Sequence, residues 1–279
     1  MQRCNTSTTF WLLGFAVLVI TSATTNAALY SFGLDRFQIN RDLLADSIDE
    51  FDDNHLGSWY VDNGTAIEAG GLLTLTNPGD ISTEIVDGYL ATYEESEVAS
   101  IDPSYGVADG EGGFTATTTL VTGAPAQNSL FFMEFDIESS VDNLDDIVIG
   151  ISNLDPMTAG VTDGRRPSGL SIMFLNDEPG FAALQSVPIV EADITGDILL
   201  SLTFDDSTNQ VTGAYSLDGG SSFLSPFSPI DTRIDQASDS NWELTAMSLD
   251  AEAVPEPSSV LLLGTGLAVL ARLNRRRRA

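Results

Sequence analysis

The stretch LFFMEFDIE at residues 130–138 alternates apolar with acidic side chains and decides the fold class. Phe131, Met133, Phe135 and Ile137 share one parity, and the acidic residues after Met133 share the other. Because successive side chains of a β-strand point to opposite faces, this pattern predicts a strand with one buried face and one wetted face.

Similar short runs, rich in β-branched and aromatic residues, follow one another along residues 28–253. They are residues 59–61, 72–76, 114–121, 130–137, 146–152, 169–175, 197–204, 210–217 and 242–249. Turn-forming pairs such as Asn63-Gly64, Pro179-Gly180 and Asp218-Gly219 separate them. The pattern predicts an all-β body, an antiparallel two-sheet sandwich or jelly roll. Only Phe37–Phe51 has a pattern that permits a helix.

The charge of this body restricts its partners. Residues 28–254 contain 40 acidic residues, five arginines and no lysine, which leaves a formal charge of −35. Such a body repels nucleic acid and anionic lipid, so neutral sugars, cations or basic proteins are the expected partners. The chain has 43% hydrophobic residues, a content typical of a folded protein.

Residues 1–27 have the features of a signal peptide. Arg3 is followed by the apolar run Phe10–Ile20 and by small residues that end at Ala27. The apolar run has 11 residues, fewer than the roughly 20 that span a bilayer, so cleavage by signal peptidase is expected and an uncleaved anchor is the alternative. Cys4, the single cysteine, lies within this segment, so the mature protein is expected to contain no cysteine.

Residues 254–279 form a tail of three parts: a proline-containing motif, a short apolar run at 258–271 and an arginine-rich end. The motif consists of Pro255, Glu256 and Pro257. The arginines that would stop the tail at the cytoplasmic side of the membrane are Arg272, Arg275, Arg276, Arg277 and Arg278.

This tail resembles the PEP-CTERM sorting signal of Gram-negative bacteria that make exopolysaccharide. The resemblance implies transient insertion of a short hydrophobic helix into the inner membrane and cleavage by an exosortase near the motif. It further implies release to the cell surface or the extracellular matrix. A permanent C-terminal anchor is the alternative, although the run is short for that purpose.

Two segments of the body suggest a fold family. Residues 51–76 contain an early tryptophan strand and a hairpin that ends in Gly-Gly-Leu-Leu, and residues 199–223 contain a strand, a turn and a second strand that ends in Asp-Gly-Gly. Both resemble the concanavalin A-like and laminin G-like sandwiches, a resemblance that implies a lectin-like fold and does not by itself assign a function.

The residues Glu134, Asp136 and Glu138 fall on one strand face. Their spacing resembles the E-x-D-x-E strand of laminarinase and lichenase glycoside hydrolases. By that resemblance Glu134 is the nucleophile, Glu138 the acid/base and Asp136 the residue between them. Retaining chemistry needs the two outer carboxyl groups ~5.5 Å apart, whereas a flat strand separates their Cα atoms by roughly 13 Å. The alternative is an acidic strand face without catalytic function.

Three acidic pairs offer oxygen ligands of the kind that calcium prefers. They are Asp52 and Asp53, Asp145 and Asp146, and Asp205 and Asp206. Calcium is therefore the one cofactor that the sequence suggests, and solvated turns are the alternative.

Three tyrosines in an acidic, turn-rich region are candidates for stacking against sugar rings: Tyr89, Tyr93 and Tyr105. Trp59 and Trp242 lie in strand patterns and are expected in the core. His55 is the only histidine, which excludes a multi-histidine zinc site.

Together these features predict an exported, exosortase-processed, non-enzymatic surface or matrix protein that binds carbohydrate and associates with exopolysaccharide. A secreted polysaccharide hydrolase that uses Glu134 and Glu138 is the alternative, and a purely structural acidic matrix protein is the third possibility.

Overall fold

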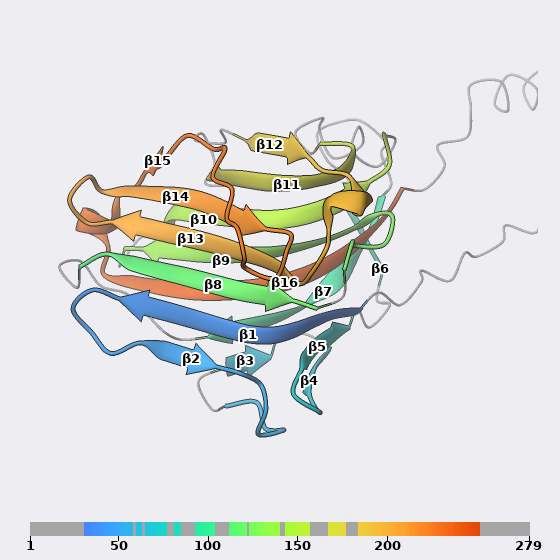
Figure 1. Cartoon of the computed structure of the whole chain (residues 1–279), viewed down its shortest axis with the longest axis horizontal. Coiled ribbons are helices and arrows are strands. Elements are labelled where there is room, and N and C mark those ends of the chain that lie inside the picture. Colours follow the sequence, from blue (N-terminus) through green and yellow to red (C-terminus); the bar gives the residue numbers. More distant parts are fainter. Residues whose placement is uncertain are drawn as a thin grey trace, which may run out of the picture.

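A computed structural model of the chain describes residues 31–57, 60–62, 65–76, 81–84, 93–103, 112–121, 123–139, 143–156, 167–176 and 184–251. These residues form two antiparallel sheets that lie one in front of the other (Figure 1). The two-sheet sandwich predicted from the sequence is confirmed, and each of the nine predicted runs overlaps a strand. The signal peptide and the sorting tail lie outside the described residues.

Sheet A is the nearer sheet in Figure 1. Its path is β15 (Ile230–Asp231), β14 (Gln210–Ser216), β13 (Ile198–Asp205), β8 (Phe114–Leu120), β1 (Ser31–Arg41), β5 (Leu73–Thr76) and β4 (Thr65–Glu68). The short strand β2 (Ser47–Asp49) pairs with β1 on the same side as β5.

Sheet B lies behind sheet A. Its path is β12 (Gln185–Pro188), β11 (Gly169–Asn176), β10 (Asn143–Leu154), β9 (Ser129–Glu138), β16 (Asp239–Ala251), β7 (Tyr93–Pro103) and β3 (Tyr60–Asp62), with β6 (Ile81–Glu84) paired to β7. Two 3-10 helices, η1 (Glu191–Asp193) and η2 (Ile234–Gln236), lie in the connections. The last of these strands in the sequence, β16, is inserted between β9 and β7.

Phe37–Phe51, the one segment whose pattern permits a helix, contains strands instead. Its first residues belong to β1 and residues 47–49 form β2, with Phe37 opposite Asp49. The reason is the period of burial: Phe37 and Ile39 are buried, whereas Gln38 between them faces outward. That two-residue period suits a strand whose apolar face meets the other sheet.

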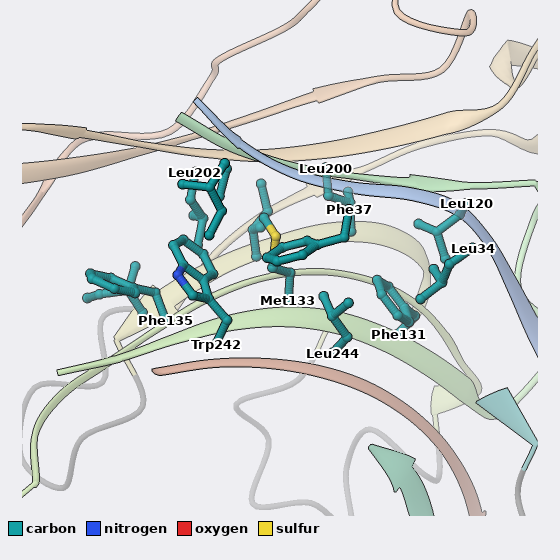
Figure 2. Packing of buried hydrophobic residues seen from close by; sticks show 14 of the residues in the cluster. Leu34, Phe37, Leu120, Phe131, Met133, Phe135, Leu200, Leu202, Trp242 and Leu244 are labelled. Atoms are coloured by element: carbon teal, nitrogen blue, oxygen red, sulfur yellow. The ribbon is translucent and has the colours of Figure 1, made fainter. Parts of the chain in front are cut away.

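The core lies between the sheets and is rich in aromatic rings (Figure 2). Trp242 of sheet B is fully buried, as predicted. It stacks on Phe135 with 4.6 Å between ring centroids and meets Phe114 and Phe37 of sheet A edge-on, at 5.5 and 6.0 Å. Such aromatic pairs contribute roughly 0.5–1.5 kcal/mol each beyond the area that they bury. These rings therefore fix the two sheets against each other.

A second contact between the sheets depends on a glycine. A Cβ atom added to Gly213 of β14 would lie 2.8 Å from the ring of Phe174, which comes from β11. This is closer than real Cβ atoms approach a neighbour, so the absence of a side chain at residue 213 allows the ring to fit.

Candidate functional site

The outer face of β9 carries the acidic residues that the sequence singled out. Met133, Phe135 and Ile137 are fully buried toward sheet A, and the alternation places Glu134 and Asp136 on the opposite face, where both are half-buried. The predicted separation of apolar and acidic residues on this strand is confirmed.

Strand β10 adds a third carboxylate to this face. Its register shifts between Asn143 and Asp145, and Asp146 then lies directly opposite Asp136. One carboxylate oxygen from each of Glu134, Asp136 and Asp146 lies within 4.8 Å of the other two. We call these three residues the acidic triplet. Oxygen ligands from several carboxylates at this separation suit a divalent cation such as calcium, which also offsets the repulsion between the like charges.

Glu138 is not part of the acidic triplet. It is exposed at the end of β9 and lies opposite Asn143 and Asp239. The structure therefore groups Glu134 with Asp136 and Asp146, and it does not group Glu134 with the Glu138 carboxylate that retaining hydrolysis would require.

Strand β16 extends the polar face on the other side of β9. Asn241 lies opposite Asp136 and Glu243 lies opposite Glu134, and both are half-buried. The Thr245 hydroxyl donates a 2.5 Å hydrogen bond to Glu243. Neither Asn241 nor Glu243 was predicted as a site residue from the sequence. Glu243 stands between the apolar Trp242 and Leu244, and this alternation indicates that it faces outward.

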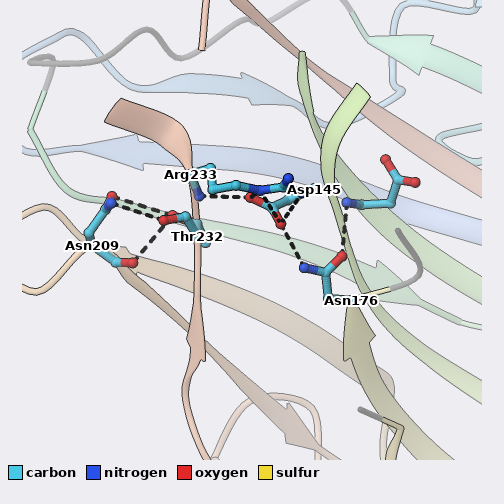
Figure 3. Close-up of polar contacts among 6 residues, drawn as sticks. Asp145, Asn176, Asn209, Thr232 and Arg233 are labelled. Atoms are coloured by element: carbon cyan, nitrogen blue, oxygen red, sulfur yellow. Dashed lines mark hydrogen bonds and ion pairs between the residues drawn. The ribbon is translucent and has the colours of Figure 1, made fainter. Parts of the chain in front are cut away.

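Asp145 is almost completely buried and lies beside Arg233 and Asn176 (Figure 3). Because neighbouring strand residues alternate between faces, Asp145 faces away from the half-buried Asp146. It accepts hydrogen bonds from the Asn176 side chain at 2.7 Å, from the Arg233 backbone amide at 2.7 Å and from the Arg233 guanidinium at 3.0 Å. The amide of Asp146 donates to the Asn176 side chain at 3.3 Å, which ties the register shift of β10 to β11. The two residues of this predicted calcium pair thus lie on different faces of sheet B.

The other two acidic pairs lie in separate turns. Asp205 accepts hydrogen bonds from the Ser207 hydroxyl at 2.6 Å and the Ser207 amide at 2.9 Å, and these bonds lower its pKa. Asp53 accepts a 2.8 Å bond from the His55 amide. Asp52 and Asp206 are exposed. No cation site that joins these pairs is found in the described part of the chain.

Most of the aromatic and sorting residues cannot be placed on this geometry. Trp59, Tyr89, Tyr105, the motif Pro255–Pro257 and the terminal arginines lie outside the described residues. Tyr93 is the first residue of β7.

The body of the chain is a two-sheet β-sandwich with an acidic outer face. Comparison with known proteins identifies the C-terminal tail. Residues 253–278 match the PEP-CTERM protein-sorting motif. The chain therefore carries an exosortase-type sorting signal, which indicates export to the cell surface or beyond. No curated protein matches the sequence.

Several solved structures are similar to this chain at low sequence identity. A lectin from Bauhinia forficata in complex with GalNAc has a TM-score of 0.43 and 9% identity, over 80% of this chain and 99% of that one. Lectin II from Ulex europaeus has a TM-score of 0.40 and 11% identity, over 80% and 92%. The CBM2 module of the evolved Dit of Lactobacillus casei BL23 phage J-1 has a TM-score of 0.42 and 10% identity, over 78% and 90%. Within the described residues, no helix is long and apolar enough to span a membrane.

Proposed function

We propose that this chain is an exported, exosortase-processed protein of the cell surface or extracellular matrix that binds carbohydrate and is not an enzyme. The export step rests on the PEP-CTERM match at residues 253–278. The binding step rests on the outer face of sheet B.

The acidic triplet is the observation that carries the proposal. Carboxylates accept hydrogen bonds from sugar hydroxyls, and a calcium ion held by Glu134, Asp136 and Asp146 would position such groups or bind hydroxyl oxygens directly. Asn241 offers an amide donor and acceptor on the same face, opposite Asp136. A row of acceptors with one amide suits a polyhydroxylated ligand.

The charge of the body selects among polysaccharides. With a formal charge of −35 over residues 28–254, a neutral glycan approaches the face without repulsion, and an anionic one is repelled unless a cation intervenes. We therefore propose neutral or calcium-bridged exopolysaccharide as the ligand class, with Tyr89, Tyr93 and Tyr105 as stacking residues.

The proposal is tested by co-sedimentation of the full-length chain, in mild detergent, with insoluble or cross-linked polysaccharides in calcium and in chelator. Saturable binding to a neutral glycan is expected, weakened at least tenfold by Asp136→Asn, which corresponds to about 1.4 kcal/mol. Asp206→Asn removes the same charge from an exposed turn and serves as the matched control. Binding that is absent for every polysaccharide, or equal in the two variants, contradicts the proposed site.

The non-enzymatic part has its own test. Incubation of the bound polysaccharide with the wild-type chain is expected to release no reducing sugar. Release that disappears in Glu134→Gln would instead support the hydrolase.

The sorting step is tested in a native PEP-CTERM host. Replacement of Pro255, Glu256 and Pro257 by alanine is expected to keep the chain in the inner-membrane fraction. Wild-type chain in the surface or medium fraction is the control, and identical fractionation of the two contradicts processing at this motif.

A further inference from the structure

The burial pattern of β4 is the reverse of the usual one for an edge strand of a sandwich, because its apolar residue is exposed and its acidic residue is buried. Ile67 faces solvent and is 56% exposed, whereas Glu68 is 9% exposed. Glu68 lies opposite the fully buried Leu73 of β5 and shares its face with Ala66, which packs against the core. A carboxylate thus occupies a position that an apolar residue would normally fill.

The buried carboxylate of Glu68 forms no hydrogen bond of normal geometry with a described residue. Both of its oxygens are inaccessible to solvent and neither accepts a hydrogen bond. The two arginines of β1 have other partners: Arg36 pairs with Glu50, and Arg41 donates to Ala45 and Ser47. A buried ionised carboxylate normally has a hydrogen-bonding or positively charged partner. Among the described residues, Glu68 has no positively charged partner.

The neighbours of Glu68 are other acids. Burial is the main cause that raises the pKa of Glu68, and the adjacent carboxyl group of Asp53 raises it further, as Asp49 does more weakly. The backbone amide of His55 acts in the opposite direction. The Asp53 carboxyl group therefore lies beside that of Glu68, and Asp49 is the next acid in the neighbourhood.

The loop that follows β2 is held in place on the β4–β5 hairpin. The Gly70 amide of the hairpin donates to the Asn54 side chain at 2.8 Å, and the His55 amide donates to Asp53 at 2.8 Å. Phe51 is fully buried with a φ of 48°, and its amide donates to Asp49 at 2.9 Å. The acids are thus positioned by the backbone.

We propose that Glu68 and Asp53, with Asp49 beside them, bind a divalent cation, and that this cation is calcium. The ligands are all oxygen atoms, which calcium prefers and zinc does not. The ion supplies the positive charge that balances the Glu68 carboxylate, and it links the loop of residues 50–57 to the edge of sheet A. It is distinct from the acidic triplet, because β4 ends sheet A whereas β9 and β10 lie within sheet B (Figure 1). Asp53 belongs to a pair that the sequence suggested for calcium, and Glu68 is the ligand that only the structure supplies.

The test compares the thermal unfolding of four full-length chains, each in excess chelator and in calcium. The chains are the wild type, Glu68→Gln, Asp136→Asn and the matched control Glu191→Gln, which alters an exposed residue of η1. Calcium at 100 times its dissociation constant is expected to raise Tm by about 5–10 °C through this site. The rise should be reduced in Glu68→Gln and unchanged in Glu191→Gln. Asp136→Asn should lose only the share that calcium at the acidic triplet contributes and should keep the rise that depends on Glu68.

The order of stabilities gives a second readout. In chelator, Glu68→Gln should be at least as stable as the wild type, because the amide removes an uncompensated buried charge with little change in shape. In calcium it should be the less stable of the two. An equal calcium response in wild type and Glu68→Gln overturns the proposal. So does a wild type whose stability does not respond to calcium and rises only as the pH is lowered, because a proton would then neutralise Glu68.

Discussion

The Asp145 carboxylate and the Arg233 guanidinium, 88 residues apart in the sequence, form a 3.0 Å ion pair that joins β10 of sheet B to the segment after β15 of sheet A. The Asp145 side chain is only 2% exposed. The backbone amide of Thr232, next to Arg233, donates to the Asn209 carbonyl in the β13–β14 turn, and the Asn209 side-chain amide donates to the Thr232 carbonyl. The pair therefore connects the edge of one sheet to the middle of the other.

Replacement of Arg233 by alanine should destabilise the fold by about 3 kcal/mol, because it leaves Asp145 buried without its charge partner. Urea denaturation followed by tryptophan fluorescence measures the change. Arg36→Ala, which breaks the exposed Arg36–Glu50 pair, is the control and should cost less than about 1 kcal/mol. Similar losses in the two variants would mean that burial adds nothing to the Arg233 pair.

Trp242 should tolerate phenylalanine far better than alanine. Its indole Nε1 is buried and has no hydrogen-bond partner among the residues that the structure describes, so Trp242→Phe loses volume and none of the described hydrogen bonds. We expect a cost of about 1–2 kcal/mol for phenylalanine and about 3–5 kcal/mol for alanine. Chemical denaturation monitored by far-UV circular dichroism compares them, and equal costs would contradict the ring-packing role given to Trp242.

Gly213→Ala should destabilise the sandwich although alanine normally suits a strand better than glycine. The new Cβ would meet the Phe174 ring at 2.8 Å and force the two sheets or the ring to move. A cost of about 1–3 kcal/mol is expected from such overpacking. The double variant with Phe174→Leu should recover part of the loss, and an unchanged Gly213→Ala stability would show that the ring adapts freely.

Asp218 should make stability depend on pH in the acid range. Its carboxylate accepts hydrogen bonds from the side chains of Ser222 and Ser216, which lower its pKa to about 2 from the usual 3.8. A lowered folded-state pKa contributes stability above the unfolded-state value and loses it as the pH falls from about 4 to about 2.

The Asp218→Asn variant tests this dependence. Its urea midpoint should lie below that of the wild type at pH 6, and the difference should shrink as the pH falls toward 2. Asp206→Asn, in another exposed turn, controls for the loss of charge. A difference that is independent of pH would mean that the Asp218 carboxylate does not hold the turn through its charge.

The strands with a strong apolar period were predictable from the sequence, whereas the acidic and polar ones were not. The run at 130–137 fixed β9 because its burial alternates without interruption. Strand β7 was missed because YEESEVASIDP has four acids and no apolar period. The helix that the pattern permits at 37–51 does not form, because Phe37 and Ile39 pack as strand residues against the other sheet.

The sequence placed Glu134 and Asp136 on one strand face and indicated Asp146 separately, in an acidic pair, but it could not bring Asp146 to the other two. Their convergence depends on the register shift in β10, which turns Asp146 outward and Asp145 inward. Glu68 shows the same limit, since hydropathy would place Ile67 inside and the glutamate outside. Both cases are set by strand register, which a single sequence does not encode locally.

The position of β16 sets the order in which the body can fold during export. This strand lies between β9 and β7, yet it is the last described strand of the chain and ends two residues before the sorting motif begins at residue 253. Until residues 239–251 have crossed the membrane, β9 and β7 have no neighbour on their facing edges, and Trp242 is missing from the core. A chain that crosses N-terminus first can therefore complete sheet B only when the sorting tail itself has reached the membrane.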